Sequence, residues 1–446
     1  MRSFMILCTA LMISTALAEE PSLQTGLALQ SSSMSFSDLV GRVEATSPKI
    51  LQQKVNTELS KAKLAQVTSQ YYPTINLGGT SEYSHKFKVS ATPSYIGDSS
   101  LTQDTQYQTS SVLSVNYDLF RFGATYLGVK AAKKEIVSSL ANQCVVSEQV
   151  LLELLDTYQK ARVDTIKLKY LSQIEKLYEK IYSSGKRLRT YGSLKQTDLS
   201  TYALNVADTI ESISQFKEDR VGLIAHLAYL SGAKIDDTVT LDPLQTKTIY
   251  TALPPFEKST KARQARAVIE QKTAELEAEE KSYFPVFSLY GKYDFYGSSQ
   301  DTFSNSIDNL EKNGYRVGLA VSWKIFDGFK READIKIKLL ELKNAKISQE
   351  EAKRKYEEQE RQLNYQIHNI SKRVLVAQTS TDTSHEIVTM STRLHAQGEG
   401  DQLQILKSKV AYYQNLSKNE VAKEMLASAK MKKVLILRKE SECTAH

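Results

Sequence analysis

Residues 314–326 read GYRVGLAVSWKIF, and this stretch decides the fold. Apolar side chains take every second position from Tyr315 to Ile325, and the positions between them are polar or small, as at Arg316 and Lys324. This alternation gives a strand one apolar face and one polar face. Residues 106–120, QYQTSSVLSVNYDLF, have the same form. Soluble strands are usually about 5–6 residues long, whereas strands that cross an outer membrane need about 9–11.

Aromatic side chains lie near the ends of the predicted strands. Strands that cross an outer membrane carry aromatic girdles at both interfaces, which favours this use over ligand binding. The predicted membrane aromatic positions are Tyr83, Tyr107, Tyr117, Phe120, Tyr315, Trp323 and Phe326.

The first residues have the form of an export signal. Arg2 precedes an apolar run over residues 4–17, and Ala16 and Ala18 give a small-x-small cleavage site, so residues 1–18 are a predicted signal peptide. The run is too short for a membrane anchor, and no later stretch approaches the length of a transmembrane helix. Residues 19–35 are polar and are predicted to be a disordered lead.

No pattern typical of an enzyme is present. The six histidines are scattered, and none has metal-ligand spacing to another histidine or to a cysteine. A disulfide between Cys144 and Cys443 is possible but not favoured. The net charge of +7 is spread over lysine-rich stretches, which is more typical of solvated faces than of a nucleic-acid surface. We expect no catalytic site, no cofactor and no metal.

The chain is predicted to contain a duplication, because landmarks recur in the same order. Tyr72-Pro73 before one strand matches Phe284-Pro285 before another, and Gly192 after one long helix matches Gly398 after the next. The predicted first repeat covers residues 36–232, with a β-hairpin at 74–120, a long helix at 124–185, a tip at 185–199 and a helix to 230. A linker follows at 233–257. The second repeat covers 258–437, with a β-hairpin at 286–326, a long helix at 329–394, a tip at 393–406 and a helix to 437, before a tail at 438–446.

The long helices favour an extended structure. A helix of about 60 residues spans roughly 90 Å. Its apolar residues fall on a narrow, heptad-like seam, as at Ile174 and Ile181. Such a seam is typical of a coiled coil, although two ordinary amphipathic helices in a bundle remain an alternative for any one seam.

Four strands cannot close a barrel, for which about eight is the minimum. In lipid only helices and closed barrels satisfy every backbone hydrogen bond. Apolar faces turned to lipid therefore require several copies. Two copies give a filled interior, and three copies give a barrel with room for a bore.

The chain resembles the TolC family of outer-membrane efflux and secretion channels over residues 36–437. The resemblance lies in the two helix-Pro-strand junctions, in YDLFRFGA (117–124) and WKIFDGFK (323–330), and in the turns RTYGSLKQTDL (189–199) and HAQGEGDQLQIL (395–406). It implies a mainly α fold with a transmembrane β-barrel, formed by a homotrimer with four strands per chain and twelve in all, continued by a long α-helical coiled-coil tunnel. It also implies the outer membrane of a Gram-negative bacterium, with a large periplasmic part. The implied partners are outer-membrane lipid, a periplasmic adaptor and an inner-membrane transporter, in drug efflux or in type I protein secretion.

The resemblance further implies that the tips contact the adaptor and gate the tunnel. The family's tip aspartate corresponds to Asp198, for which a carboxylate favoured at a helix start is an equal alternative. Two other family carboxylates correspond to Gln404 and Lys407, their arginine partner to Gly400, and a gating tyrosine to His395, so this chain departs from the family pattern. The candidate tip residues are Arg187, Arg189, Tyr191, Gly192, Asp198, Arg393, His395, Gly398, Asp401, Gln404 and Lys407.

Two other functions are weighed. An exported coiled-coil scaffold or adhesin without a pore predicts a soluble trimer or a fibre. A simple porin is disfavoured, because most of the chain is predicted to be helical. The sequence does not indicate the transported substrate.

Overall fold

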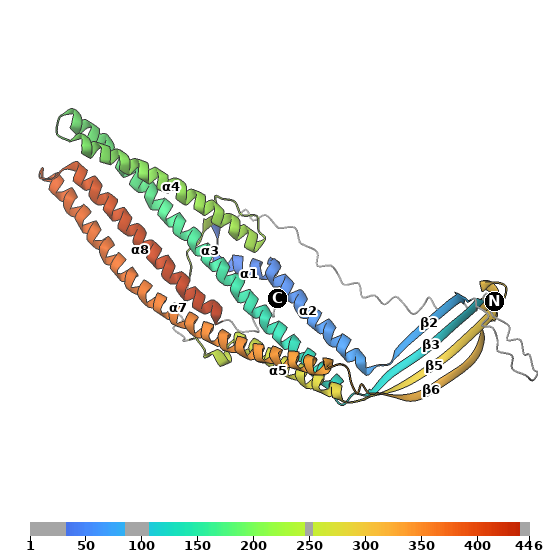
Figure 1. The fold of residues 1–446 in the computed structure, drawn as a ribbon. Coiled ribbons are helices and arrows are strands. Elements are labelled where there is room, and N and C mark those ends of the chain that lie inside the picture. Colours follow the sequence, from blue (N-terminus) through green and yellow to red (C-terminus); the bar gives the residue numbers. More distant parts are fainter. Residues whose placement is uncertain (1–32, 85–106, 246–252, 438–446) are drawn as a thin grey trace, which may run out of the picture.

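The computed structural model describes residues 33–84, 107–245 and 253–437. The molecule is long, with a four-stranded sheet at one end and the tips of two helical hairpins at the other (Figure 1). The predicted signal peptide, most of the predicted lead and the tail at 438–446 lie outside the described residues. Among the described residues, no helix combines the length and apolar character that crossing a membrane requires.

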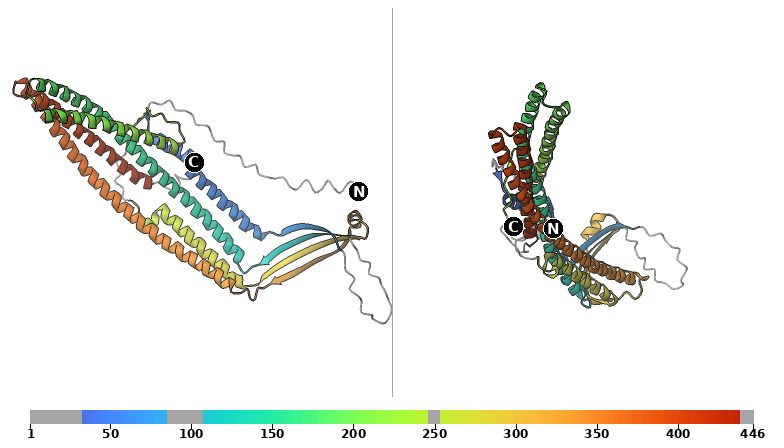
Figure 2. Two further views of the ribbon diagram at one scale, coloured as in Figure 1. Left: turned by 45° about the horizontal axis from the view of Figure 1, so that its top comes forward. Right: turned by 90° about the vertical axis from the view of Figure 1, so that its left-hand side faces the viewer.

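Two long helices run through the molecule. Each contains 67 residues, which corresponds to about 100 Å. Near the sheet, α2, α3, α5 and α7 lie side by side in that order, and nearer the tips the order is α4, α3, α8 and α7 (Figure 2). The bounds of these helices are α2 Pro48–Thr68, α3 Ala124–Thr190, α4 Gln196–Ser231, α5 Thr260–Glu280, α7 Lys330–Ala396 and α8 Gln402–Ile436.

The sheet is antiparallel throughout, with the strand order β2-β3-β5-β6. A short helix, α6 (Phe303–Asp308), lies between β5 and β6. The 3-10 turns η1 (Ser69–Tyr71) and η3 (Lys281–Tyr283) follow α2 and α5, just before the two Pro residues. The strands are β2 Thr74–Tyr83, β3 Tyr107–Phe120, β5 Val286–Ser299 and β6 Glu311–Ser322.

The last strand ends earlier than predicted. β6 stops at Ser322, so Trp323 and Phe326 lie in the turn that leads to α7. The indole nitrogen of Trp323 donates to the carbonyl of Tyr283 at 3.1 Å, in the segment that precedes β5. Phe329 then adopts a left-handed conformation with φ +65° at the start of α7. The apolar alternation continues through these residues, but their backbone no longer pairs.

A compact core joins the helices halfway along the molecule. It contains α1 (Phe36–Thr46), the middle of α3, the end of α4 and a short parallel pair, β1 (Ser33–Met34) with β4 (Thr240–Leu241). The Tyr158 hydroxyl lies 3.0 Å from the carbonyl oxygen of Met34 and 2.7 Å from that of Asp242, so its one proton is shared between the two acceptors. The end of the predicted disordered lead is therefore ordered, because α3 holds it against the linker. The linker ends in the 3-10 turn η2 (Phe256–Lys258).

A buried ion pair fixes this core to α8. The Nε of Arg162 lies 3.6 Å from a carboxylate oxygen of Glu424, and both side chains are largely buried. Arg162 also donates to the carbonyl of Leu241, and Glu424 accepts from the amide of Leu244. The ion pair itself is electrostatic, since the buried Nε of Arg162 makes no hydrogen bond. The two hydrogen bonds tie the linker to α3 and α8 at the same point.

Candidate functional site

The strand register separates the sheet into an apolar face and a polar face. Residues paired across antiparallel strands point to the same side. The pairs Leu77↔Leu113, Tyr293↔Tyr315 and Leu289↔Leu319 therefore share one face. The described residues of the apolar face include Ile75, Leu77, Tyr83, Tyr107, Leu113, Val115, Tyr117, Leu289, Tyr293, Phe295, Tyr315, Val317, Leu319 and Val321.

The opposite face carries the polar side chains. Arg316 pairs with Asp294 at 2.7 Å, and Ser288 donates to Asp118 at 2.8 Å. Of the two polar positions named from the sequence, Arg316 lies on this face and Lys324 lies beyond β6. The other charged or amide side chains on this face include Glu82, Asn116, Asp118, Lys292 and Asp294.

Six of the seven predicted membrane aromatic positions lie near one of the two ends of the sheet, and one does not. Tyr83 and Tyr107 pack together at the end of the sheet far from the helices, with ring centroids 5.1 Å apart. Tyr117, Phe120, Trp323 and Phe326 lie at the end near the helices. Tyr315 lies instead near the middle of β6, opposite Tyr293, so it is not at a strand end.

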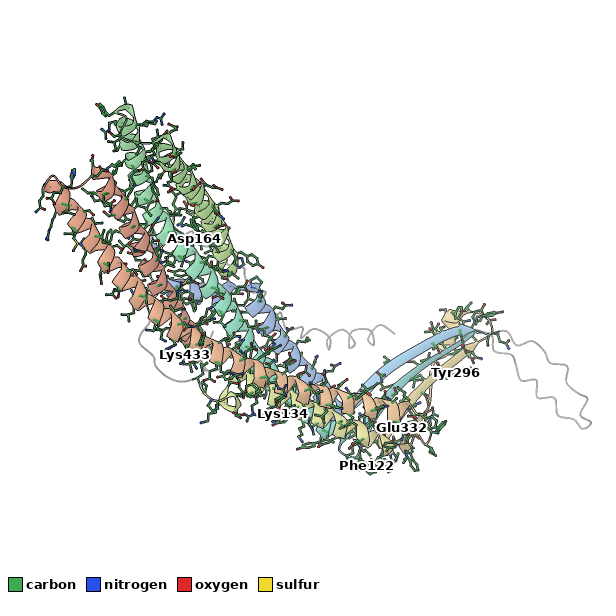
Figure 3. All side chains as sticks on the ribbon, turned by 60° about the vertical axis from the view of Figure 1, so that its left-hand side comes forward. Phe122, Lys134, Asp164, Tyr296, Glu332 and Lys433 are labelled. Atoms are coloured by element: carbon green, nitrogen blue, oxygen red, sulfur yellow. The ribbon has the colours of Figure 1, made fainter. Side chains whose placement is uncertain are left out.

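The sequence-based prediction missed part of the aromatic cluster where the sheet joins the helices. The ring of Phe122, labelled in Figure 3, stacks on that of Phe284 with centroids 4.7 Å apart. Phe122 has a left-handed backbone, φ +50°. After each strand a second Phe follows within three residues, in Phe120-Arg121-Phe122 and in Phe326-Asp327-Gly328-Phe329, and this recurrence was the signal that could have identified it.

The tip turns are shorter than predicted, because both long helices continue into them. Arg187 and Arg189 lie in the last turn of α3, and Arg393 and His395 lie in the last turn of α7. Cations are favoured at helix C-termini. Gly192 and Gly398 follow with φ of +75° and +83°, a conformation for which glycine carries no steric penalty.

An apolar cluster packs the two hairpins together beneath their tips. Within the first hairpin, Gly185 lets α3 and α4 approach closely, since a Cβ there would lie 2.9 Å from the ring of Tyr202. The buried members of the cluster, from α3, α4 and α8, are Ile174, Ile181, Tyr202, Leu403 and Val410.

The remaining candidate tip residues do not form one site. Asp401 accepts from the amide of Leu403 at 3.1 Å and so caps α8. The Nδ1 of His395 lies 2.7 Å from the carbonyl of Gly400. The ammonium of Lys407 lies 5.1 Å from the centroid of the Tyr202 ring.

Four further tip positions point to solvent. Tyr191 and Asp198 are exposed beside the first turn, and Glu399 and Gln404 are exposed beside the second. Among the described residues, no ion pair joins any of the candidate tip side chains to another.

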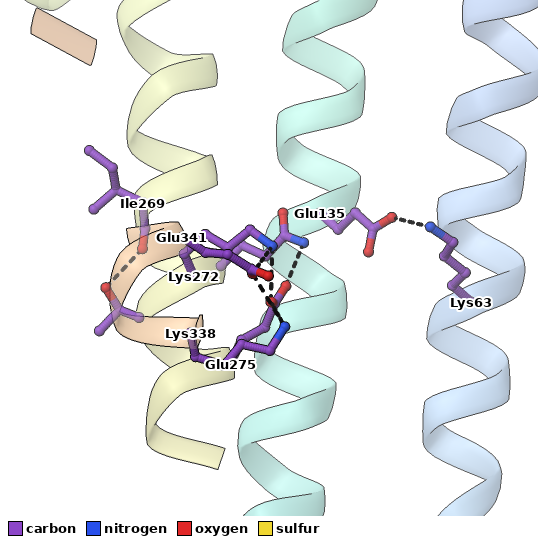
Figure 4. Close-up of polar contacts among 9 residues, drawn as sticks. Lys63, Glu135, Ile269, Lys272, Glu275, Lys338 and Glu341 are labelled. Carbon is purple, nitrogen blue, oxygen red and sulfur yellow. Dashed lines mark hydrogen bonds and ion pairs between the residues drawn. The ribbon is translucent and has the colours of Figure 1, made fainter. Parts of the chain in front are cut away.

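A network of four charged residues joins α5 to α7 in the half of the molecule near the sheet (Figure 4). Lys272 lies 3.0 Å from both Glu275 and Glu341, and Lys338 lies 3.1 Å from Glu275. Burial disfavours the charged form of Glu275, but hydrogen bonds from the two lysines outweigh it and hold its pKa below the usual value. A hydrogen bond from Lys272 is the main cause of the lowered pKa of Glu341.

Other ion pairs occur at the neighbouring helix boundaries. Lys63 of α2 pairs with Glu135 of α3 at 2.8 Å (Figure 4). Lys261 of α5 pairs with Glu148 of α3 at 3.1 Å. Successive helices near the sheet are therefore connected by charged pairs, whereas the tips pack through apolar side chains.

The α5–α7 network predicts a definite dependence of stability on pH. Burial lowers the pKa values of Lys272 and Lys338, but their carboxylate partners outweigh it and raise them. The lowered carboxyl pKa values give stabilisation that is present above the unfolded pKa near 4.5 and lost as the pH falls through the folded values. The raised lysine pKa values give stabilisation that is present below 10.5 and lost as the pH rises through the folded values.

We therefore expect the double variant Glu275→Gln/Glu341→Gln to lower the unfolding temperature most between about pH 5 and 10, with the difference shrinking below about pH 4. Thermal unfolding in detergent, followed by circular dichroism, measures it. Glu351→Gln is the control, because Glu351 pairs only with Lys355 on the exposed surface of the same helix and should change little. An equal difference between wild type and double variant at pH 3 and pH 7 contradicts the assignment.

Within the described residues, no group of three or more His, Cys, Asp or Glu side chains is arranged to hold a metal ion. The candidate functional sites are therefore two surfaces, the apolar face of the sheet and the pair of exposed helical tips.

Comparisons with known proteins agree with this architecture. A family described as outer membrane efflux protein matches residues 39–233 and 257–430. A search of curated proteins by sequence gives no match.

Solved structures of outer-membrane proteins have the same fold. VceC from Vibrio cholerae is 14% identical over 90% of this chain and 95% of that chain, with a TM-score of 0.70. The CmeC channel from Campylobacter jejuni is 13% identical over 91% and 88%, with a TM-score of 0.72. The MtrE channel from Neisseria gonorrhoeae, in its open state, is 15% identical over 93% and 94%, with a TM-score of 0.71.

Proposed function

Because the chain belongs to the outer membrane efflux protein family, whose proteins are TolC-type channels of the Gram-negative outer membrane, we propose that it forms the outer-membrane conduit of a tripartite efflux or type I secretion system. Three copies would close one twelve-stranded barrel, and their helices would continue it as a tunnel through the periplasm.

The strongest support is that, in the part that the structure describes, the sheet of a single chain has two unpaired edge strands and an exposed apolar face. Its apolar face is exposed, with Val317 and Leu319 each more than 70% accessible. Within the described residues no strand pairs with the outer edge of β2 or of β6. Unpaired edges and a bare apolar face are unfavourable in water. Pairing β6 of one copy with β2 of the next removes both unpaired edges, because those two strands would also be antiparallel, and lipid would cover the apolar face.

The internal duplication belongs to the same proposal. The order of two strands, a long helix and a second helix occurs on both sides of the linker, and α3 and α7 are equal in length. We assign residues 36–232 and 258–437 to the two repeats, with 233–257 as the segment between them. Each repeat then supplies two barrel strands and one helical hairpin.

The tips at 185–199 and 393–406 are proposed to contact a periplasmic adaptor, which connects the channel to an inner-membrane transporter. Arg187, Arg189 and Tyr191 are exposed there, which suits contact with a partner. The proposed gate is a movement of the helical hairpins, and the channel itself makes and breaks no bond. The transporter selects drugs or proteins as cargo.

Sizing and conductance test the proposal. The full chain, extracted from the outer membrane in detergent, is expected to migrate as a trimer whose mobility changes on heating. In a planar bilayer it is expected to conduct ions in discrete steps. A monomer in aqueous buffer without detergent contradicts the barrel, and a trimer without conductance favours the scaffold or adhesin.

A further inference from the structure

A polar pocket of about 430 Å³ lies where the sheet meets the helices. Its walls come from the start of α3, the end of α5 with η3, the start of β5 and the turn between β6 and α7. Segments far apart in the sequence therefore meet in one place. Neither the tips nor the apolar face of the sheet contributes to it.

The pocket is rich in positive charge. Its lining includes three carboxylates, Glu279, Asp327 and Asp334, and five cations, Arg121, Lys281, Lys324, Lys330 and Arg331. The cations therefore outnumber the carboxylates.

Several of these cations already have structural partners. Arg331 is buried, lies 3.4 Å from Asp327 and donates to the carbonyl of Lys324. Arg121 donates to Gln70, and Lys281 lies over the ring of Phe284. By contrast, no ion pair within the described residues involves Lys324 or Lys330. These two exposed lysines are available to a ligand.

The strand register shows which side of the sheet the pocket opens to. Val286 and Ser322 line it and are paired directly. They lie on the same side as the pair Lys292↔Arg316, which is the polar face. The exposed apolar side chains of the following turn, Ile325 and Phe326, do not line the pocket. A ligand therefore reaches the pocket through water rather than from lipid.

We propose that this pocket binds a dissolved anion that carries a phosphate group, through Lys324 and Lys330. Lysine binds phosphate as a compact point charge with three donors. Lys330 is also the first residue of α7, so the positive end of that long helix adds to the field. The pocket opens to the lumen if the proposed trimer is correct, and anionic cargo then meets it as it enters the barrel. Binding itself requires only this chain.

Inorganic phosphate is the probe, titrated by calorimetry into the detergent-solubilised full chain at constant ionic strength set with chloride. Saturable binding is expected for the wild type. Lys324→Gln/Lys330→Gln is expected to weaken it about a hundredfold, since each of the two lost charged contacts corresponds to about a factor of ten. Lys336→Gln is the matched control, because Lys336 is exposed on α7 and does not line the pocket. Circular dichroism checks that each variant is folded.

Absence of saturable binding in the wild type, or equal affinity in the double variant, overturns the proposal. A second arm distinguishes the sources of phosphate. In nanodiscs of phosphatidylcholine with phosphatidylglycerol, the affinity for inorganic phosphate should equal that in phosphatidylcholine alone. Competition by phosphatidylglycerol would instead identify a lipid headgroup as the occupant, and it would overturn the proposal that the ligand is a dissolved anion. Calorimetry detects phosphate binding whether or not the protein conducts ions. Phosphate binding without ion conduction would therefore refute the proposed channel but support the proposed phosphate site.

Discussion

Replacement of Val317 by arginine is expected to remove the proposed trimer from the outer membrane. Val317 lies near the middle of β6 on the apolar face and is 72% exposed in the single chain. An arginine turned to lipid at the bilayer midplane costs about 2–4 kcal/mol, and the penalty falls towards the interfaces. The penalty is paid in each of three copies, so we expect little heat-modifiable trimer in outer-membrane fractions analysed by gel electrophoresis.

The neighbouring polar face provides the control for Val317→Arg. Ala320 lies on the same strand, opposite Ser288, and its side chain points to the other side of the sheet. Ala320→Arg places the same charge in water and should leave the trimer abundant. A soluble scaffold predicts a different result, because an arginine at an exposed position in water changes stability by little. Equal trimer yields from the two variants would refute the lipid-facing assignment.

Replacement of Arg162 by methionine is expected to destabilise the middle of the molecule by about 3–5 kcal/mol, because it leaves a buried carboxylate without its cation. The partner, Glu424, has only 6% of its side chain exposed. The variant also loses the hydrogen bond to the Leu241 carbonyl, which helps to hold β4. Thermal and denaturant unfolding of the detergent-solubilised protein measure the loss.

Two further variants show whether the stability loss of Arg162→Met comes from the unpaired buried charge of Glu424 or only from lost packing. Arg162→Met/Glu424→Leu removes both charges and should recover most of the stability, since replacement of a buried ion pair by apolar residues is often close to neutral. Arg354→Met is the surface control, because Arg354 pairs with Glu350 while both side chains are largely exposed. It should change the free energy of unfolding by less than about 1 kcal/mol. If the single variant Arg162→Met is as stable as the double variant, the ion pair does not have this role.

Local patterns in the sequence were sufficient for the strands and the long helices. The alternation around Val317 predicts a strand with two unlike faces, and the pairing of β5 with β6 confirms it for the residues from Tyr315 to Val321. Alternation cannot give the end of that strand, because Trp323 and Ile325 keep the pattern after pairing stops. After pairing stops, Trp323 and Lys324 instead form hydrogen bonds with Tyr283 and Arg331, which lie outside the strand.

Contacts between side chains or strands that are distant in the sequence could not be predicted from local patterns. The pair β1 and β4 has two residues on each strand, too few for any periodicity, and it forms because Tyr158 bonds to the backbone on both sides. The α5–α7 charge network uses lysines and glutamates that resemble many others on the same helices. At the tips, the sequence places Lys407 in the turn region, but its contact with Tyr202 follows only from the packing of α8 on α4 and α3.

The central pairing of the sheet has a consequence for how the protein is made. β3 pairs with β5, so Tyr107 lies opposite Ser299, and residues 121–285 separate the two strands. During export the first hairpin emerges long before its neighbour exists. Contacts between residues so far apart in sequence form slowly, and an open strand edge is prone to aggregation in the meantime. Because the pairing is slow, protection of the open strand edge by a chaperone during this interval is expected to raise the yield of the folded protein.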